Sequence, residues 1–215
     1  MAERDTSSPE SIGKYHFTQD WFGQYIPIWN GLVPLVKPSK ILEIGSFEGR
    51  STCYMIESSA AERDVEMHCV DTWEGSTEHA EIDMSAVEQR FRKNTALAIS
   101  TVPHKVDLVT HKSTSLLALT QLISSGHASS FDLIYVDGSH RAPDVLSDAV
   151  LSFHLLRPMG LLIFDDYLWS MERAGEQDSF NMPKPAIDSF VNIYQRNLIV
   201  LPARLSQIYI QKLGA

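Results

Sequence analysis

Five acidic residues lie at the ends of apolar runs, and their positions define a candidate site for ligand chemistry. Each run has the length and the β-branched content of a buried strand. The acids are Glu43, Asp71, Asp137, Asp165 and Asp166. Because the carboxyl ends of parallel strands meet at the edge of a sheet where ligands bind, we expect these carboxylates to converge there.

The last three acids form a candidate site for a divalent cation. Asp137 and Asp165 end strands that are separated by one predicted helix, so a right-handed crossover places them at the same edge. Asp166 adds a carboxylate from the same turn. Bare carboxylates this close repel each other, and a hard cation with oxygen ligands relieves the repulsion. Pairing with Arg141, or capping of the following loop, is the alternative without a metal.

A histidine lies next to this group and is a candidate general base. The turn reads Asp137-Gly138-Ser139-His140. The intrinsic pKa of imidazole suits proton transfer near neutral pH. Asp137 is a second candidate for the base, and a histidine that only hydrogen-bonds the turn is the alternative for His140.

The stretch 41–49 contains the turn around which the other elements are arranged. An apolar strand at 41–44 is followed by Gly45 and Gly49, and a helix begins at Arg50. Gly45 permits a sharp turn and lets a ligand lie against bare backbone. The G-x-x-x-G spacing differs from the G-x-G-x-x-G of NAD-binding proteins. A strand-to-helix turn without a ligand is the alternative.

Asp71 ends the second predicted strand, at 65–70, and follows Gly49 by 22 residues (71 minus 49). In nucleotide-binding α/β folds, an acid near that offset accepts hydrogen bonds from ribose hydroxyls. The sequence therefore predicts a nucleotide-like ligand between the glycine turn and Asp71.

Strands and helices alternate along the chain. Further predicted strands lie at 105–110, 131–136 and 161–164, and further helices at 84–99, 113–123, 143–156 and 185–194. Ser113 is the predicted N-cap of its helix, and residues 157–160 end the helix before the fifth strand. Strands at 197–201 and 207–212 are joined so tightly that they must be antiparallel. These patterns predict a Rossmann-like, doubly wound α/β fold with a mostly parallel seven-stranded sheet and a C-terminal antiparallel hairpin.

The length of 215 residues fits one domain with a full hydrophobic core. Residues 1–14 are polar and acidic, and we expect them to be disordered or loosely attached. Residues 15–215 form the domain. Its first part, 15–38, is rich in aromatic residues at roughly helical spacing, which Pro27 and Pro34 interrupt. One or two short helices are predicted there, packed on the core or acting as a lid.

A second aromatic segment, at 167–184, is predicted to be irregular. A long loop of this kind beside a strand's carboxyl end suits the border of a small-molecule pocket. An ordinary surface loop is the alternative.

Composition excludes several classes of function. The formal net charge of -9 argues against a general nucleic-acid binder, which needs clustered Lys and Arg. No run approaches the roughly 18 apolar residues of a membrane span. Residues 1–14 do not resemble a secretory signal. Cys53 and Cys69 form neither a disulfide framework nor a zinc site, so a reducing cytoplasm is the expected setting.

Four motifs, in order and at normal spacing, resemble those of the class I S-adenosylmethionine-dependent methyltransferases. They are LEIGSFEGRST from Leu42, VDTWEG from Val70, FDLIYVDGSH from Phe131 and LLIFDDY from Leu161. The resemblance extends from about residue 17 to 213. It is greatest to the small-molecule O-methyltransferase branch that contains macrocin-type and novobiocin-type sugar O-methyltransferases.

This resemblance implies an enzyme that binds S-adenosyl-L-methionine and Mg²⁺. The implied cofactor-binding residues are Glu43, Gly45, Ser46, Gly49, Asp71, Trp73, Ser113 and Asp137. Asp71 would bind the ribose hydroxyls, whereas Trp73 and Ser113 would contact the adenine. The implied ligands of Mg²⁺ are Asp137, Asp165 and Asp166.

The leading interpretation is methyl transfer to a hydroxyl of a small metabolite, assisted by a divalent metal, with Asp137 or His140 as the catalytic base. Gly138-Ser139-His140 replaces the acidic or aromatic continuation of the sugar enzymes. A metal-independent O- or N-methyltransferase that uses His140 therefore stays open, as does a catalytically silent cofactor-binding protein. The glycine spacing and the hairpin disfavour an NAD-dependent oxidoreductase. The acceptor and the oligomeric state, including a homo-oligomer, also stay open.

Overall fold

The structure is a computed structural model that describes residues 14–76 and 81–214. The predicted loose attachment of the N-terminus falls on residues 1–14, and all of these except Lys14 lie outside the described residues. Within the described ranges, no helix is both long enough and apolar enough to cross a membrane.

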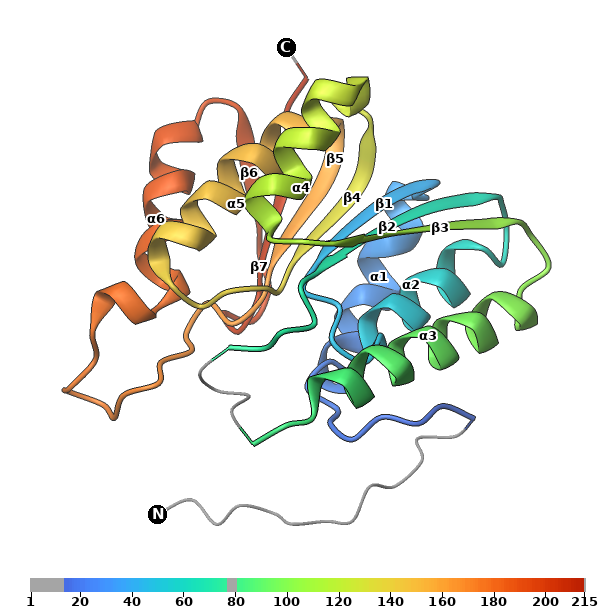
Figure 1. Ribbon diagram of the computed structural model, residues 1–215. Coiled ribbons are helices and arrows are strands. Elements are labelled where there is room, and N and C mark those ends of the chain that lie inside the picture. The colour runs from blue at the N-terminus through green and yellow to red at the C-terminus, as the bar shows by residue number, and fades with distance from the viewer. Residues whose placement is uncertain (1–13, 77–80, 215) are drawn as a thin grey trace.

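A seven-stranded sheet with the order β3-β2-β1-β4-β5-β7-β6 forms the centre of the molecule (Figure 1). Its strands are β1 (Lys40–Ile44), β2 (Val65–Asp71), β3 (Val106–Lys112), β4 (Phe131–Val136), β5 (Leu156–Phe164), β6 (Leu198–Leu201) and β7 (Ile208–Lys212). The first five strands pair in parallel, and β7 is antiparallel to both β5 and β6. This arrangement confirms the predicted Rossmann-like sheet with its C-terminal hairpin.

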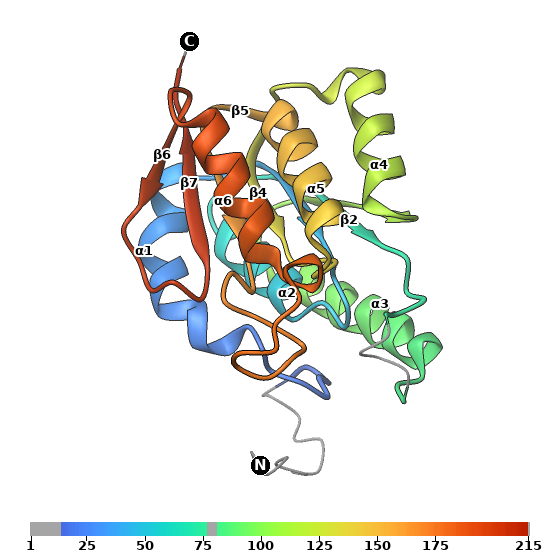
Figure 2. The same cartoon turned by 90° about the vertical axis from the view of Figure 1, so that its left-hand side faces the viewer.

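Helices cover both faces of the sheet. The helices α1 (Ile26–Val36), α2 (Arg50–Ser59) and α3 (Met84–Thr101) cover one face, and α4 (Ser115–Leu122), α5 (Ala142–Leu155) and α6 (Pro183–Tyr194) cover the other. Figure 2 shows α4, α5 and α6 side by side in front of the sheet. Every residue of β4 is buried, because alternate side chains enter the two hydrophobic layers.

Two predictions about the limits of elements are wrong: the start of the fifth strand and the interruption of the first helix at Pro34. The fifth strand begins at Leu156 instead of residue 161, and its register with β4 shifts near Phe131. Such an irregularity tolerates Pro158, which cannot donate a ladder hydrogen bond. Pro34 lies inside α1 without interrupting it. The carbonyl that loses its amide partner belongs to Asn30, an exposed residue in the middle of the helix, where water can replace that partner.

The predicted N-cap of α4 is also wrong. The helix begins at Ser115, and Thr114 occupies the N-cap position. The Ser113 hydroxyl donates to the Thr114 carbonyl at 3.2 Å, and the residue is half-buried at the end of β3. The strand runs on to Lys112, two residues beyond the predicted end, which moves the helix start along the chain.

The loops that follow the parallel strands gather at one edge of the sheet, at the bottom of Figure 1. The glycine loop at 45–49, the turn at 137–141 and the long loop at 165–182 all belong to this edge. The segment that precedes α1 also lies on this side in Figures 1 and 2. All the elements that carry predicted site residues therefore converge here.

Gly45 sets the closest approach within this edge and yields a stability prediction. Its φ is +82°, and an added Cβ would lie 1.9 Å from the Asp137 carbonyl oxygen. Gly45→Ala should lower the free energy of unfolding by at least about 2 kcal/mol, since it combines a left-handed backbone with a backbone clash. Urea unfolding followed by circular dichroism measures the change.

Gly31→Ala is the matched control, because a Cβ at Gly31 in α1 meets nothing within 4 Å. It should be neutral or stabilising by up to about 1 kcal/mol, as expected for an exposed helix position. Equal stabilities of the two variants would contradict the proposed close approach of Gly45 to Asp137.

Candidate active site

Glu43 lies beneath the glycine loop and is fully buried. Its carboxylate accepts hydrogen bonds from the hydroxyls of Ser46 at 2.7 Å, Ser51 at 2.5 Å and Thr52. Burial raises the pKa of Glu43 above its ordinary value, and the hydroxyl donors oppose that rise. Glu43 therefore joins the end of β1 to the loop and to the first turn of α2.

Asp71 holds the same loop through backbone amides. Its Oδ2 accepts from the amides of Ser46 and Phe47, both at 2.9 Å, and its Oδ1 accepts from the Trp73 amide at 2.7 Å. The Trp73 indole is buried against Phe91 and donates to the Phe47 carbonyl at 3.0 Å. Asp71 and the Trp73 indole therefore both stabilise the glycine loop through hydrogen bonds to its backbone.

The glycines join this loop to its neighbours. A Cβ added to Gly45 would meet the Asp137 backbone, and the contact of a ligand with the bare backbone of Gly45 stays a prediction. Gly49 has a φ of +81°, and an added Cβ would lie 3.1 Å from Phe91 and 3.3 Å from Thr95 of α3. The loop after β1 is therefore fixed both to the turn after β4 and to helix α3.

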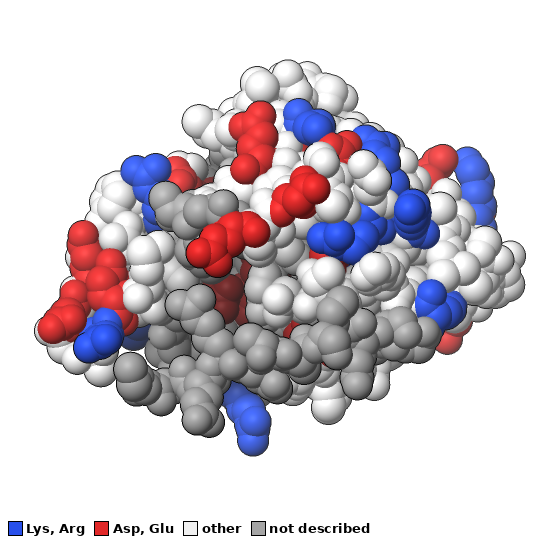
Figure 3. Space-filling model, turned by 60° about the horizontal axis from the view of Figure 1, so that its bottom comes forward, with Lys and Arg blue, Asp and Glu red and all other residues white. Residues whose placement is uncertain are grey.

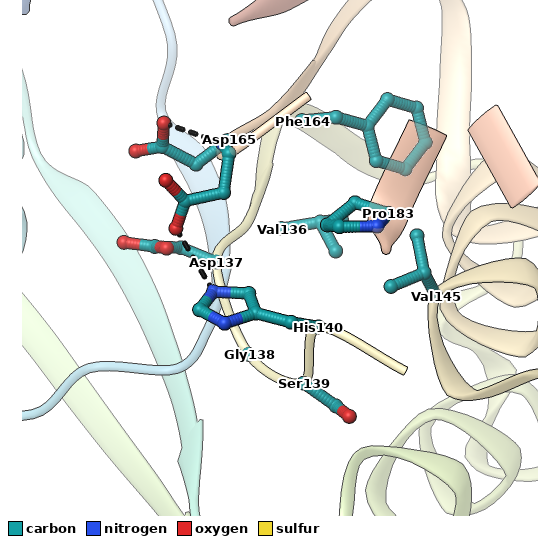
Figure 4. Close-up of a pocket in the computed structure, with 10 residues that line it drawn as sticks. Val136, Asp137, Gly138, Ser139, His140, Val145, Phe164, Asp165 and Pro183 are labelled. Atoms are coloured by element: carbon teal, nitrogen blue, oxygen red, sulfur yellow. Dashed lines mark hydrogen bonds and ion pairs between the residues drawn. The ribbon is translucent and has the colours of Figure 1, made fainter. Parts of the chain in front are cut away.

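Asp137, His140 and Asp166 form the group that faces the pocket at the end of β4. Their potential ligand atoms all lie within 4.8 Å of one another. His140 Nε2 lies 2.9 Å from Asp166 Oδ2, and Figure 4 shows Asp137 and His140 on the same side of the pocket. The Trp169 ring packs on the imidazole, with 4.1 Å between centroids. The geometry thus brings together two of the predicted metal ligands and the predicted base.

Asp165, the third predicted metal ligand, also lines the pocket, but its carboxylate is hydrogen-bonded to buried side chains. Its Oδ2 accepts from the Gln207 amide at 2.9 Å and from the Tyr135 hydroxyl, and its Oδ1 accepts from the Asp166 amide at 2.8 Å. Asp166 has a φ of 53°, a left-handed conformation that separates the directions of the two neighbouring side chains. His140 lies in this group with the other two predicted ligands, and the metal-binding role of Asp165 stays a prediction.

The three acids repel each other electrostatically. Removal from water raises the pKa of Asp137 well above its usual range, and the charges of Asp165 and Asp166 raise it further. Burial, with the Asp166 charge added, raises the pKa of Asp165 to about 6. The Arg141 guanidinium lies over the Phe180 ring at 4.9 Å, whereas an ion pair with the acids was the predicted alternative. The group therefore favours a shared proton or a bound cation.

Sequence analysis missed Tyr135 and Gln207. The Tyr135 hydroxyl lies 3.1 Å from Asp137 Oδ2 and also donates to Asp165. Gln207 Oε1 accepts from the Trp29 indole at 2.9 Å, which ties the acids to α1. Tyr135 could have been found, because residues two apart on a strand share a face. No local pattern marks Gln207, whose partners come from distant parts of the chain.

The surroundings of the group combine charge with exposed apolar side chains. Figure 3 shows acidic side chains around and inside a hollow on this face of the molecule. The loop after β5 exposes Leu168, Met171 and Phe180, and Trp21 packs on Phe47 of the glycine loop at 5.1 Å between centroids. Acidic side chains thus lie around and inside the hollow, and exposed apolar side chains lie on the loop after β5 and beside the glycine loop.

Comparison with known proteins identifies the class to which this fold and site belong. A family model described as "Methyltransferase domain" matches residues 42–167. An uncharacterized protein of Sinorhizobium fredii, y4gI, is 28% identical over 141 residues, or 65% of this chain. The chain spans only 14% of the length of that relative.

Two solved structures share the fold. TomG, an O-methyltransferase from Streptomyces achromogenes involved in tomaymycin synthesis and solved with S-adenosylmethionine, gives a TM-score of 0.61 at 19% identity, covering 87% of this chain and 78% of TomG. MycE, a methyltransferase of the mycinamycin biosynthetic pathway solved with Mg, S-adenosylhomocysteine and mycinamycin VI, gives 0.58 at 15% identity, covering 91% of this chain and 51% of MycE.

The chain belongs to the methyltransferase domain family, whose matched segment runs from β1 to the turn after β5. This finding confirms the predicted methyltransferase family.

The contacts of Asp71 yield a prediction about the glycine loop. Asp71→Asn should speed hydrogen exchange of the Ser46 and Phe47 amides by at least tenfold. The reason is that a hydrogen bond to a charged acceptor contributes about 1.5–3 kcal/mol. Glu74→Gln, at an exposed position on the same connection, is the control and should leave both rates unchanged. Wild-type exchange rates in Asp71→Asn would show that Asp71 does not hold the loop.

Proposed function

We propose that this chain transfers the methyl group of S-adenosyl-L-methionine to a hydroxyl of a small metabolite, with the assistance of a divalent cation. The observation that carries the proposal is the group Asp137, His140 and Asp166, which adjoins the glycine loop through the contact of Gly45 with the Asp137 backbone. Cofactor and acceptor would therefore meet over the ends of β1 and β4.

The glycine loop supplies a cradle that fits the cofactor. Helix α2 begins after Gly49, and among the described residues no side chain caps its first turn. Uncapped amides at a helix N-terminus suit an anionic group such as the carboxylate of the methionine part. Asp71 would bind the ribose hydroxyls beside this loop, and Ser113 lies half-buried at the end of β3, where the adenine is expected. Glu43 and Trp73 would stabilise the conformation of the glycine loop from the interior.

The acidic group fits a cation with oxygen ligands. Asp137 and Asp166 supply two carboxylates, and Mg²⁺ is commonly bound by one or two carboxylates while it keeps several waters. Burial and the charges of Asp165 and Asp166 raise the pKa of Asp137, which supports a positive charge beside it. Asp165 would hold the pair from behind through Tyr135 and Gln207. When bound, the cation would lower the pKa of an acceptor hydroxyl.

His140 would take the proton of the acceptor hydroxyl as the oxygen attacks the methyl group. Asp166, at 2.9 Å, orients the ring and stabilises the imidazolium that forms. Trp169 packs on the ring and fixes its plane. The products are the methyl ether, S-adenosylhomocysteine and one proton. The apolar border formed by Trp21, Leu168 and Met171 would hold the body of the acceptor and exclude water.

The acceptor class follows from this border and from the neighbours. A site with an acidic centre and exposed apolar walls suits a hydroxylated metabolite with an apolar body. TomG takes part in tomaymycin synthesis, and MycE was solved with mycinamycin VI, so both neighbours support a natural-product acceptor. The net charge of -9 supports the absence of nucleic-acid partners, and two free buried cysteines support a cytoplasmic setting.

A second candidate function rests on the His140–Asp166 contact itself. This pair resembles a base with its orienting carboxylate and could act on an O or N acceptor without a metal. A catalytically silent cofactor-binding protein is the further alternative. The intact His140–Asp166 pair counts against it.

The experiment follows methyl transfer from labelled S-adenosyl-L-methionine to a panel of hydroxylated aromatic, macrolide and sugar metabolites. His140→Gln should lower kcat by about 10²–10⁴-fold, the usual contribution of a general base, while binding of S-adenosylhomocysteine is retained. Excess chelator should abolish turnover, and added Mg²⁺ should restore it.

His154→Gln is the control, because His154 is exposed at the end of α5. It should keep full activity. Full turnover in chelator would reject the metal role and leave the His140–Asp166 pair acting alone. Failure to bind S-adenosylhomocysteine at all would overturn the proposed function.

A further inference from the structure

A second group of metal-ligating side chains lies outside the proposed active site. His68 on β2 is only 4% exposed, and it is surrounded by Glu66, His111 and His127. The potential ligand atoms of Glu66, His68 and His127 all lie within 4.8 Å of one another. His68 Nε2 is 2.7 Å from Glu66 Oε1, and His68 Nδ1 is 2.9 Å from His111 Nε2.

The fold positions these side chains through strand alternation and one glycine turn. Glu66 and His68 are two residues apart on β2, so they share a face of the sheet. His111 lies on β3, opposite Val70, which places its ring diagonally across from His68. His127 ends the turn Ile123–His127 after α4, where Gly126 adopts a φ of 91°.

We propose that Glu66, His68 and His127 bind one divalent transition-metal ion, with Zn²⁺ as the best fit. Two imidazoles and one carboxylate, completed by water, are a ligand set that zinc accepts. Imidazole ligands favour Zn²⁺, Cu²⁺ and Ni²⁺ over the oxygen-seeking Mg²⁺. His111 would not bind the metal in this arrangement. It would hold His68 in the binding orientation through the hydrogen bond between the two rings.

The hydrogen bonds of His68 allow both a metal-free and a metal-bound state. Without metal, His111 Nε2–H donates to His68 Nδ1, and His68 Nε2–H donates to Glu66. When both rings change tautomer, His68 Nδ1–H donates to His111 and His68 Nε2 becomes a free ligand atom. This change needs no net gain or loss of protons. A ligand histidine whose other nitrogen donates to a partner is the usual arrangement in metal sites.

A metal ion would have to displace Lys40, whose ammonium group pairs with the Glu66 carboxylate. Lys40 Nζ lies 2.9 Å from Glu66 Oε1 and 5.2 Å from the centre of the Phe131 ring. The lysine ammonium and a metal ion would therefore compete for the Glu66 carboxylate.

The site is separate from the proposed catalytic edge. Glu66 and Asp71 are five residues apart on β2 (71 minus 66), or roughly 16 Å at the usual rise of a strand. A metal at Glu66, His68 and His127 would join β2 to the connection between α4 and β4. Its binding would stabilise the folded chain by mass action without contact with the methyl acceptor.

The test is zinc competition against a chromophoric chelator, using protein that carries Asp166→Asn and His140→Gln to remove the proposed active-site ligands. One Zn²⁺ per chain should bind, and the thermal midpoint should rise with zinc. His127→Gln should weaken binding by at least tenfold. His111→Gln should weaken it by about 10–100-fold, the usual effect of losing a partner of a ligand histidine. Lys40→Met should strengthen it.

The control is His104→Gln, at a histidine whose nearest acid is Asp64. Zinc affinity should be unchanged in this variant. Cobalt substitution adds an optical readout, since visible bands of four-coordinate Co²⁺ should disappear in His127→Gln. Absence of zinc binding in the folded background protein, or equal affinity in His127→Gln, would overturn the proposal.

Discussion

The close approach of two backbone segments, Gly45 after β1 and Asp137 after β4, is the constraint on which the candidate site depends. The Gly45 amide donates to the Val70 carbonyl and the Asp137 amide to the Ile44 carbonyl, both at 2.8 Å. These bonds continue the sheet ladder past the ends of the strands, so both turns keep the register of the strands. Only a residue without a Cβ fits between them. The loop that would hold the cofactor and the acid that would face the acceptor are therefore one rigid unit.

A second constraint keeps acidic charge at this edge of the sheet. Asp165 is tied to Tyr135 and Gln207, and Gln207 is tied to Trp29 of α1. A buried carboxylate satisfied in this way stays in position, although burial and its acidic neighbours raise its pKa. The negative charge of Asp165 repels the carboxylates of Asp137 and Asp166 from the interior side. This repulsion is the physical reason for expecting a cation on their pocket side.

Most of the fold could be predicted from the sequence, because apolar runs, glycine turns and alternation of strands with helices are local signals. The strand-end acids could be predicted for the same reason. The directions of the Asp165 and His140 side chains could not be predicted from the sequence. They depend on the left-handed backbone of Asp166 and on Gln207, which comes from the terminal hairpin. The burial of Trp73 depends likewise on Phe91 of α3, which no motif specifies.

In the proposed function, one rigid edge places the cofactor methyl group beside a cation held by Asp137 and Asp166. Paramagnetic relaxation measures this most directly, with S-adenosyl-L-methionine labelled with ¹³C at the methyl group and Mn²⁺ in place of Mg²⁺. The account predicts strong relaxation of the bound methyl carbon in the wild-type protein and its loss in Asp166→Asn. An unrelaxed methyl signal while cofactor and Mn²⁺ are both bound would contradict it.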